Sequence, residues 1–535
     1  MKQKSIWMIG GIAVIILIAG TFLFATMFNR PSDKLPDVAS LPKATDTQIV
    51  DLKDGDTYEM TAGYVQKEIG NREYAMLAYN GSIPGPILRV PQGANVTLRF
   101  KNDTNIETLL HSHGLRLDNA SDGTDLVQDA IPPGGEFTYN LSFPDAGMYW
   151  YHPHVREDLA QDLGLYGNYF VTPEEAGYWS PVNQEVPLFV DDILMENDEI
   201  VPHGTEDATY ALMGRYGNVM LVNGDTNYQL NVRPGDVVRF FITNAANVRP
   251  FRIAFSGGAK MKLVGSDASA YERETWQDAV TIGPSERAVV EVMFPKSGAY
   301  KLQNSTPEST TTIGTVVASG EPASPSYADT FDVLREHTSV VSDIDRLRPF
   351  FDKSVDKSLR LSVSMNARMS GMMKNGTHSM GGGMMMNGGM MMGGSKDGIE
   401  WEDTSSAMNA SSDTSMVDWD MIDTATGKKN MDINDWNFSV GDAVKIRIDN
   451  DDSTMHPMQH PIHFHGQRFL ILSRDGVAET NMAWKDTVLI PSGQTVEILL
   501  EVTNPGTWMA HCHIAEHLEA GMALPFTVKG ESAVQ

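Results

Sequence analysis

The chain has 535 residues, with 41 Lys and Arg against 69 Asp and Glu, which gives a formal net charge of −28. This acidic balance argues against nucleic acid as a partner, because phosphate binding needs a basic surface. A single cysteine cannot form an intramolecular disulfide, so the chain is no disulfide-stapled scaffold. Hydrophobic residues make up 41% of the chain, which argues against wholesale disorder and fits several globular domains.

Residues 1–30 are expected to form a signal anchor, that is, a transmembrane helix. Lys2 and Lys4 precede an uncharged apolar run over residues 6–28, and about 20 apolar residues span a bilayer as a helix. The basic flank is expected to stay in the cytoplasm, which places the rest of the chain outside it. Secretion after signal cleavage is the alternative, and a buried core helix is a third interpretation. Residues 31–44, with three prolines, are predicted to be an extended tether.

Beyond residue 45 a repeated pattern predicts three related all-β units. Short alternating apolar and polar runs, punctuated by Gly, Pro, Asn and Asp, are typical of β-sandwiches and barrels. The motif G-x-x-V-x5-N occurs three times, and its Val-to-Asn stretch is predicted to be a strand. Its copies are Gly93/Val96/Asn102, Gly235/Val238/Asn244 and Gly441/Val444/Asn450. The expected units span residues 45–175, 183–320 and 356–530, with a partly helical connector at 321–355.

A methionine-rich segment at about 366–398 is predicted to be an insert in the third unit, after a strand at 359–365. Residues 365–392 hold eleven methionines, spaced mainly by Gly, Asn and Ser, without a helical or strand period that would bury them. Thioether is a soft ligand that selects Cu(I) over hard ions. The segment therefore indicates Cu(I) binding, and a low-complexity loop without such a role is the alternative.

Ten of the fourteen histidines lie in four short clusters, two in the first unit and two in the third. On a strand, residues i and i+2 face the same side, so each H-x-H pair is expected to present two imidazoles to one side. The second unit has Gln303 where the others have a cluster histidine, and no metal ligands are expected there. The clusters are His111-Ser-His113-Gly114, His152-Pro-His154, His460-Pro-Ile-His463-Phe-His465-Gly466 and His511-Cys512-His513-Ile-Ala-Glu-His517.

The one cysteine indicates a particular metal. A thiolate with two imidazoles and a weak axial thioether is the blue-copper electron-transfer set. Cys512, His460 and His517 are expected to supply the strong ligands, and Met522 the axial one. The other eight imidazoles can hold three coppers at a domain interface, and the chain joins Cys512 directly to two of them as an electron path. A zinc site would not call for this mixed set.

These motifs make the chain similar to the multicopper oxidases in their three-domain, laccase-like form. The resemblance covers roughly residues 45–530. It implies an all-β fold of three cupredoxin-like Greek-key β-sandwich domains, preceded here by the N-terminal transmembrane helix. It also implies oxidation of a reductant coupled to reduction of dioxygen to water. The matching segments are NGSIPGP at 80–86, HSHG at 111–114, YHPH at 151–154, HPIHFHG at 460–466 and HCHIAEHLEAGM at 511–522.

The resemblance further implies four copper ions: one type 1, one type 2 and a type 3 pair. Type 1 copper would be bound by His460, Cys512, His517 and Met522. Type 2 copper would be bound by His111 and His463. The type 3 pair would be bound by His113, His152, His154, His465, His511 and His513.

Reduction of dioxygen to water also needs protons, and a carboxylate near the cluster is a natural donor. Similar enzymes carry an aspartate in a D-G step after the first H-x-H-G motif, and Asp122 fits that position. A turn residue before glycine is the alternative interpretation. Many bacterial relatives have a second carboxylate directly after the last copper histidine, where this chain has Leu518. Glu516 and Glu519 are candidates to take its place.

The reductant in this family can be a phenol, an aryl amine, Cu(I), Fe(II) or Mn(II). The methionine-rich segment favours Cu(I), because similar cuprous oxidases carry such an insert over the type 1 site. Met455, His456 and Met458 could extend that route. We expect a monomeric, membrane-anchored, extracytoplasmic enzyme of copper detoxification. A laccase-type phenol oxidase or an Fe(II)/Mn(II) oxidase is the alternative. A non-catalytic copper-binding protein is less favoured, because every ligand position is filled.

Overall fold

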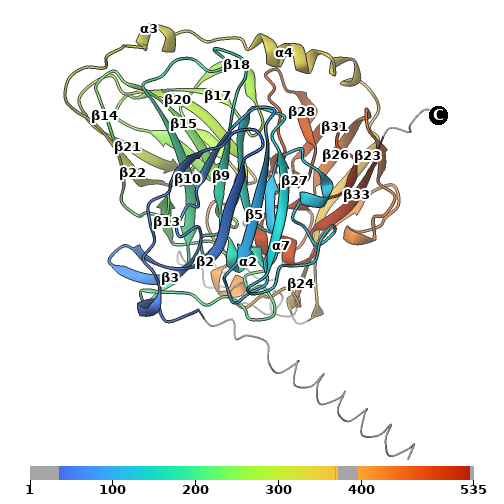
Figure 1. The fold of residues 1–535 in the computed structure, drawn as a ribbon. Coiled ribbons are helices and arrows are strands. Elements are labelled where there is room, and N and C mark those ends of the chain that lie inside the picture. The colour runs from blue at the N-terminus through green and yellow to red at the C-terminus, as the bar shows by residue number, and fades with distance from the viewer. Residues whose placement is uncertain (1–34, 368, 371–395, 531–535) are drawn as a thin grey trace, which may run out of the picture.

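The computed structural model describes residues 35–367, 369–370 and 396–530. The expected anchor segment and residues 371–395 of the methionine-rich segment lie outside these ranges. Within them, no helix has both the length and the apolar character that a membrane crossing requires. Strands dominate, as the sequence predicts, and they form three pairs of larger sheets that lie side by side in blue, green and orange-red (Figure 1). The strands span residues 49–172, 184–318 and 357–529, and the exact limits of the three units stay predictions.

The first unit packs two sheets around a common core. Their strand orders are β1-β4-β9-β8-β6 and β3-β2-β5-β7. The strands are β1 (Ile49–Asp51), β2 (Thr57–Ile69), β3 (Arg72–Tyr79), β4 (Ile87–Pro91), β5 (Asn95–Asn102), β6 (Leu110–His113), β7 (Glu136–Ser142), β8 (Gly147–Pro153) and β9 (Gly167–Thr172). The short helices are η1 (Val38–Ser40), η2 (Asn119–Ser121) and α2 (Glu157–Ala160).

The second unit has sheets of six and five strands and a small β11-β12 hairpin. The larger sheet contains β10 (Gln184–Ile193), β13 (Val219–Val222), β15 (Val237–Asn244), β17 (Lys260–Gly265), β18 (Ala270–Gln277) and β20 (Arg287–Met293). The smaller contains β14 (Tyr228–Val232), β16 (Phe251–Phe255), β19 (Val280–Ile282), β21 (Gly298–Ser305) and β22 (Thr310–Ala318). The hairpin is formed by β11 (Met195–Glu196) and β12 (Glu199–Ile200).

The third unit repeats the two-sheet arrangement. One sheet contains β23 (Lys357–Met365), β24 (Val417–Asp423), β26 (Ala443–Asn450), β28 (Arg468–Arg474), β29 (Val477–Ala478) and β31 (Thr495–Glu501). The other contains β25 (Asn437–Ser439), β27 (His460–Phe464), β30 (Thr487–Ile490), β32 (Gly506–Cys512) and β33 (Ala523–Lys529). Its helices are α6 (Ser406–Asn409), η4 (Asn430–Asp432) and α7 (Ala515–Glu519).

The threefold sequence motif has a structural basis. Its asparagine ends β5, β15 and β26, which are the three predicted strands. Each asparagine is buried, and its Nδ2 donates to two backbone carbonyls, one of them in the loop that directly follows the strand. In the third unit these acceptors are Met458 and Ile490, so Asn450 holds the segment that leads into His460. Each motif glycine has a positive φ of 83° to 96°, which other residues rarely adopt.

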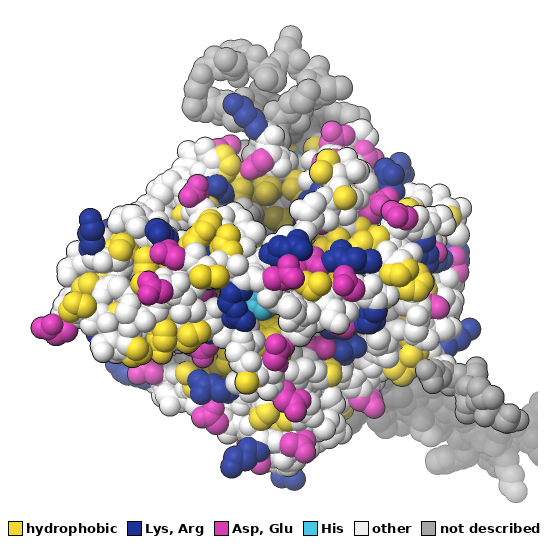
Figure 2. Space-filling model, turned by 90° about the horizontal axis from the view of Figure 1, so that it is seen from above, with side chains coloured by type: hydrophobic (Ala, Val, Ile, Leu, Met, Phe, Trp, Pro, Cys, Tyr) yellow, Lys and Arg dark blue, Asp and Glu magenta, His cyan; other side chains and the backbone are white. Residues whose placement is uncertain are grey.

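The connector between the second and third units is partly helical, as the sequence predicts. It contains α3 (Ala328–Phe331), α4 (Thr338–Asp345) and η3 (Arg348–Phe350), and it runs across the top of the molecule in Figure 1. The face seen from above shows acidic and basic side chains interspersed with hydrophobic ones (Figure 2). In the connector, Arg346 pairs with Asp343 at the end of α4.

Candidate metal centres

The thiol of Cys512 faces two imidazoles inside the third unit. Cys512 ends β32, His460 begins β27, and His517 lies on α7. The Sγ atom is 3.5 Å from Nδ1 of His460 and 3.9 Å from Nδ1 of His517, and these two nitrogens are 3.4 Å apart. Donors that share one ion at bond lengths of about 2.0–2.3 Å are separated by such distances. All three side chains are buried, so an ion bound there would be shielded from water.

Met522 is placed beside this trio by its own backbone. Its carbonyl accepts from the amide of Cys512, and its amide donates to the carbonyl of His517, both at 3.0 Å. The side chain is fully buried in the hydrophobic group that contains Cys512. Burial raises the pKa of the Cys512 thiol well above its usual value, so binding of a metal there would release a proton.

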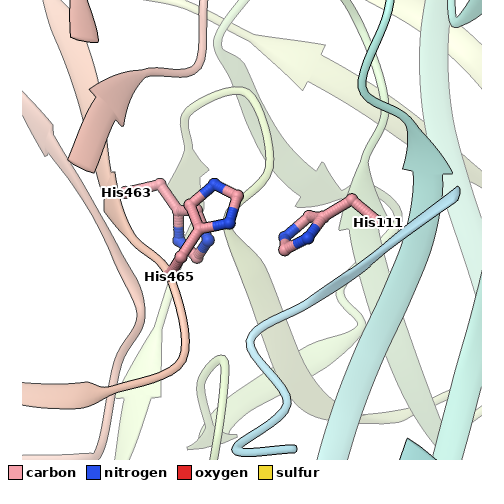
Figure 3. A group of neighbouring side chains, drawn as sticks. All are labelled: His111, His463 and His465. Atoms are coloured by element: carbon pink, nitrogen blue, oxygen red, sulfur yellow. The ribbon is translucent and has the colours of Figure 1, made fainter. Parts of the chain in front are cut away.

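Eight further histidines converge where the first and third units meet. His111 pairs with His152 across β6 and β8, and His463 pairs with His511 across β27 and β32. Figure 3 shows His111 directed towards His463 and His465 from the opposite unit. None of the eight side chains is more than 8% exposed. The structure thus brings together every histidine predicted for the trinuclear cluster, from segments more than 300 residues apart.

The expected placement of these pairs on strands is only partly right. His111 and His113 both lie within β6, but His154, His465 and His513 lie just beyond the ends of β8, β27 and β32. Alternation along a strand therefore explains one pair. In the other three pairs, the strand ends before the second histidine. His154 then leads into α2, His465 into a turn at Gly466, and His513 into the loop before α7.

The ring orientations leave lone pairs facing the centre of the cluster. His111 donates through Nδ1 to the carbonyl of Asp122 at 2.6 Å, and His463 donates through Nδ1 to the carbonyl of Asp486 at 2.8 Å. The Nε2 atoms of both rings are buried without a hydrogen-bond partner. A neutral imidazole that donates from one nitrogen offers a lone pair at the other. This is the pattern that metal-ligating histidines adopt.

Two of the rings show why a cation fits this cluster. The Nε2 atoms of His465 and His511 lie 3.0 Å apart. His465 donates through Nδ1 to the carboxylate of Asp122, and His511 donates through Nδ1 to the carbonyl of Cys512. Burial lowers the pKa of both rings, so both are neutral and their Nε2 lone pairs point at each other. A metal ion coordinated by both nitrogens satisfies this contact, and His154 completes the trio.

Asp122 lies at the edge of this cluster, as predicted. Its Oδ2 is 3.0 Å from Nδ1 of His465, and its backbone carbonyl holds His111. Burial would raise the pKa of its carboxyl, but the rings of His465 and His111 outweigh burial and hold that pKa below its usual value. Asp122 therefore contacts histidines from both units, and its carboxylate can accept a proton beside them.

Glu516 and Glu519, the candidates to replace the carboxylate missing at Leu518, both lie on α7. Glu516 is buried, and burial raises its pKa to about 8, while Asn247 donates to its Oε1 at 3.1 Å. Glu519 is partly buried and its pKa is raised to about 7 by burial. A third carboxylate, that of Glu157 on α2, lies 3.5 Å from Nε2 of His154. Helices α2 and α7 pack together, so these groups lie in one region.

Two residues of these sites carry no sequence signal. Glu157 follows the H-P-H motif but becomes a neighbour of His154 only because α2 turns back. Trp419, on β24, stacks on His517 with ring centroids 4.0 Å apart. It belongs to no repeated or spaced motif, and only the packing of β24 against α7 reveals it.

Comparison with known proteins identifies the family. Three family models, each described as multicopper oxidase, match residues 61–176, 184–321 and 402–532. This chain belongs to the multicopper oxidases. Members of the family are copper-dependent oxidoreductases that use dioxygen as the electron acceptor and hold four coppers. The donor sets described above fit such ions, and the assignment of each histidine to type 2 or type 3 copper stays a prediction.

Relatives of this multicopper oxidase are distant but match over most of their length. Multicopper oxidase MmcO of Mycobacterium tuberculosis is 27% identical, over 87% of this chain and 86% of its own. The iron transport multicopper oxidase fetC of Epichloe festucae is 25% identical, over 85% and 73%. A solved multicopper oxidase from Campylobacter jejuni, described as a metallo-oxidase, superposes with a TM-score of 0.67 at 22% identity, over 93% and 98%. That likeness supports the cupredoxin-like fold.

Proposed function

We propose that this multicopper oxidase oxidises Cu(I) to Cu(II) outside the cytoplasm and so protects the cell from copper. Four Cu(I) ions each lose one electron, and one dioxygen takes up four electrons and four protons to give two waters. The bound coppers supply the one-electron redox chemistry. The chain supplies the ligands, the covalent link from Cys512 to His511 and His513, and the carboxylate of Asp122 beside the cluster.

The observation that carries the proposal is the number of methionines in the hydrophobic core group that contains Cys512. Thioether is a soft ligand that prefers Cu(I) to the harder ions Fe(II) and Mn(II). Met365 packs against the core group of Cys512 from its edge. Met369, expected to lack a buried environment, is fully buried there, which corrects that part of the sequence prediction. The buried methionines of this core group are Met213, Met369, Met408, Met416, Met421, Met458 and Met522.

A short segment before β27 links the surface to this methionine-rich core. Met455 is 46% exposed, whereas Met458, three residues later, is fully buried. His456, between them, is buried, and its Nε2 has no hydrogen-bond partner. Burial lowers the pKa of His456 to about 4, so its ring is neutral at neutral pH and able to bind a metal. These three side chains are suited to pass a soft cation inwards.

The surroundings of the Cys512 trio disfavour a bulky reductant. His460 and His517 are at most 1% exposed, and the indole of Trp419 lies against both rings. A phenol that must touch an imidazole edge has no direct access past this indole. A cation held by thioethers can give up its electron without such contact. The net charge of −28 adds a general attraction for cations.

Variants of residues 371–395 test the proposal. One variant replaces the nine methionines of this range by serine at constant length, and the other deletes the range. If thioethers bind Cu(I), the serine variant loses Cu(I) oxidation and keeps phenol oxidation, whereas deletion also raises phenol oxidation by opening the site. Equal loss of both activities, or unchanged Cu(I) oxidation in the serine variant, contradicts the proposal. The fetC relative makes Fe(II) the second substrate to compare.

The proposed location rests on the sequence of residues 1–30. Lys2 and Lys4 before the apolar run favour an uncleaved anchor with the catalytic part outside the cytoplasm. Membrane fractionation, N-terminal sequencing and protease protection in cells test this part. A soluble mature protein that starts after residue 25 supports secretion instead, and a cytoplasmic protein contradicts both.

A further inference from the structure

Three charged or polar side chains from the three units meet behind the histidine cluster. Arg287 begins β20 in the second unit, Asp486 precedes β30 in the third, and His113 ends β6 in the first. The guanidinium binds Asp486 in a two-pronged ion pair, through Nη1 to Oδ1 at 2.7 Å and through Nη2 to Oδ2. Oδ1 of Asp486 also lies 3.0 Å from Nε2 of His113. All three side chains are completely buried.

The contact with Asp486 decides which nitrogen of His113 is free. A carboxylate can only accept a hydrogen bond, so the nitrogen of His113 that contacts Asp486 carries the ring proton. The carboxylate accepts that proton's hydrogen bond at Nε2, and Nδ1 is buried without a partner. His113 thus offers Nδ1 to the cluster, whereas His111 and His463 donate from Nδ1 and offer Nε2.

Asp486 orients a second ligand at the same time. Its backbone carbonyl accepts from Nδ1 of His463, and the rings of His463 and His113 are stacked with centroids 3.7 Å apart. One residue therefore fixes neighbouring ligands from the first and third units. The hydroxyl of Thr487, 3.1 Å from Nε2 of His113, adds a polar neighbour on the same side.

Arg287 is itself held by all three units. Its Nε donates to the carbonyl of Met148 in the first unit at 3.0 Å. Within the second unit its Nη1 donates to the carbonyl of Ser285, and its amide donates to Asp267 at 2.8 Å. Together with the ion pair to Asp486, these bonds fix the guanidinium of Arg287 in a single orientation. A planar fork that makes two parallel bonds positions a carboxylate more closely than a lysine can.

The glycine of the first histidine motif fits this pair. Gly114 has φ of +82°, and a Cβ there would lie 2.2 Å from Oδ2 of Asp486 and 3.1 Å from Nη2 of Arg287. The backbone after His113 therefore passes directly against the ion pair. Any larger residue would displace the carboxylate that holds His113.

We propose that Arg287 is a positioning residue of the dioxygen-reducing copper cluster. Acting through Asp486, it fixes His113 as a ligand through Nδ1 and keeps His463 in register with it. The second unit, which contributes no copper ligand, thereby becomes part of the copper site. Partners that orient metal ligands typically change metal affinity or activity by about 10- to 100-fold when they are removed.

The test uses the copper-loaded, full-length enzyme and three variants. Arg287→Lys keeps the positive charge and removes the fork, and Asp486→Asn keeps the shape and removes the charge. Arg249→Lys is the matched control. Arg249 is also buried and pairs with Asp192 within the second unit. It joins that unit to the third through Trp401 and Glu402, but it contacts none of the cluster histidines.

Three properties of the copper sites are measured: the copper content, the type 2 electron paramagnetic resonance signal and the near-ultraviolet band of the type 3 pair. Steady-state assays give kcat and KM for the reductant. In Arg287→Lys and Asp486→Asn we expect fewer coppers per chain, an altered type 2 signal and a weakened type 3 band. The blue type 1 colour and KM should stay, while kcat falls by about 10- to 100-fold. Arg249→Lys should keep all copper signals and change only the melting temperature.

Two results would overturn the proposal. One is a full copper complement with wild-type spectra in both Arg287→Lys and Asp486→Asn. The other is an equal loss of type 2 and type 3 signals in Arg249→Lys, which would show that any weakening of the contact between units has this effect. Should one cluster variant fail to fold, the other still decides, because each breaks the two-pronged contact from a different unit.

Discussion

The indole of Trp419 lies stacked on the imidazole of His517, with centroids 4.0 Å apart and planes inclined by 25°. Its Nε1 donates to the carbonyl of Ala211 in the second unit at 2.8 Å, which fixes the ring over the Cys512 site. The same indole contacts His460 edge-on, with centroids 4.9 Å apart. Trp419 therefore covers both imidazoles through which an external reductant would deliver an electron.

Replacing Trp419 should change which substrates the enzyme accepts. Trp419→Ala is expected to raise phenol oxidation, because it uncovers His517, and to leave Cu(I) oxidation no higher. The loss of a buried indole should also lower the free energy of unfolding by about 3–5 kcal/mol. Trp436→Ala is the control, since Trp436 is equally buried but bonds to Asp423. An equal phenol rate in both variants would show that Trp419 does not limit access.

Cys512→Ser should abolish both the blue colour and the oxidation of every reductant. A serine hydroxyl stays protonated and is a poor ligand for copper, so the electron path to His511 and His513 is cut. The eight histidines of the cluster are untouched, and about three coppers per chain should remain. Absorption spectra and metal analysis measure this directly. A wild-type protein with full copper occupancy and no blue colour would contradict the Cys512 assignment.

Asp122→Asn should separate the two halves of the reaction. The amide cannot relay a proton beside His465, so reduction of dioxygen is expected to slow by about 100-fold or more. Reduction of the type 1 site by substrate should be unchanged, and the blue colour should stay bleached during turnover. Asp125→Asn, at an exposed neighbour, is the control. A normal rate of recolouring by dioxygen in Asp122→Asn would exclude the role.

Glu400 should make the protein less stable as the pH rises. Burial raises its pKa from 4.5 to about 7 in the folded protein. The folded state therefore keeps a proton that the unfolded chain has lost, and this stabilisation, complete below pH 4.5, is lost as the pH rises through 7. The contribution is at most about 3 kcal/mol. Burial also raises the pKa of Glu157 and Glu516, which act in the same direction. The difference from Glu400→Gln is therefore the quantity to measure by chemical denaturation at several pH values. An identical pH slope in the variant would contradict this assignment.

The histidine clusters could be predicted because their members are close in sequence. His511, Cys512, His513 and His517 lie within seven residues, and the chemistry of one thiolate with imidazoles narrows the metal. The strands ending at Asn102, Asn244 and Asn450 could be predicted from the repeat and the alternation of polar and apolar residues. Local spacing and side-chain chemistry were sufficient for these features.

The supporting residues could not be predicted in this way. Asp486 contacts His113 across 373 residues of sequence, and Arg287 reaches Asp486 from the second unit. Their contacts follow from how three sandwiches pack, which no single periodicity encodes. The same holds for Trp419 above His517. The net charge of −28 is consistent with a cation as the substrate.

Whether Cu(I) is the substrate is decided by steady-state rates for Cu(I), Fe(II), Mn(II) and a phenol on the same copper-loaded wild-type enzyme. Heat-inactivated protein corrects for spontaneous oxidation by dioxygen. We expect the highest kcat/KM for Cu(I), by at least about tenfold, which corresponds to about 1.4 kcal/mol of transition-state preference. A higher kcat/KM for the phenol, Fe(II) or Mn(II) than for Cu(I) would contradict it.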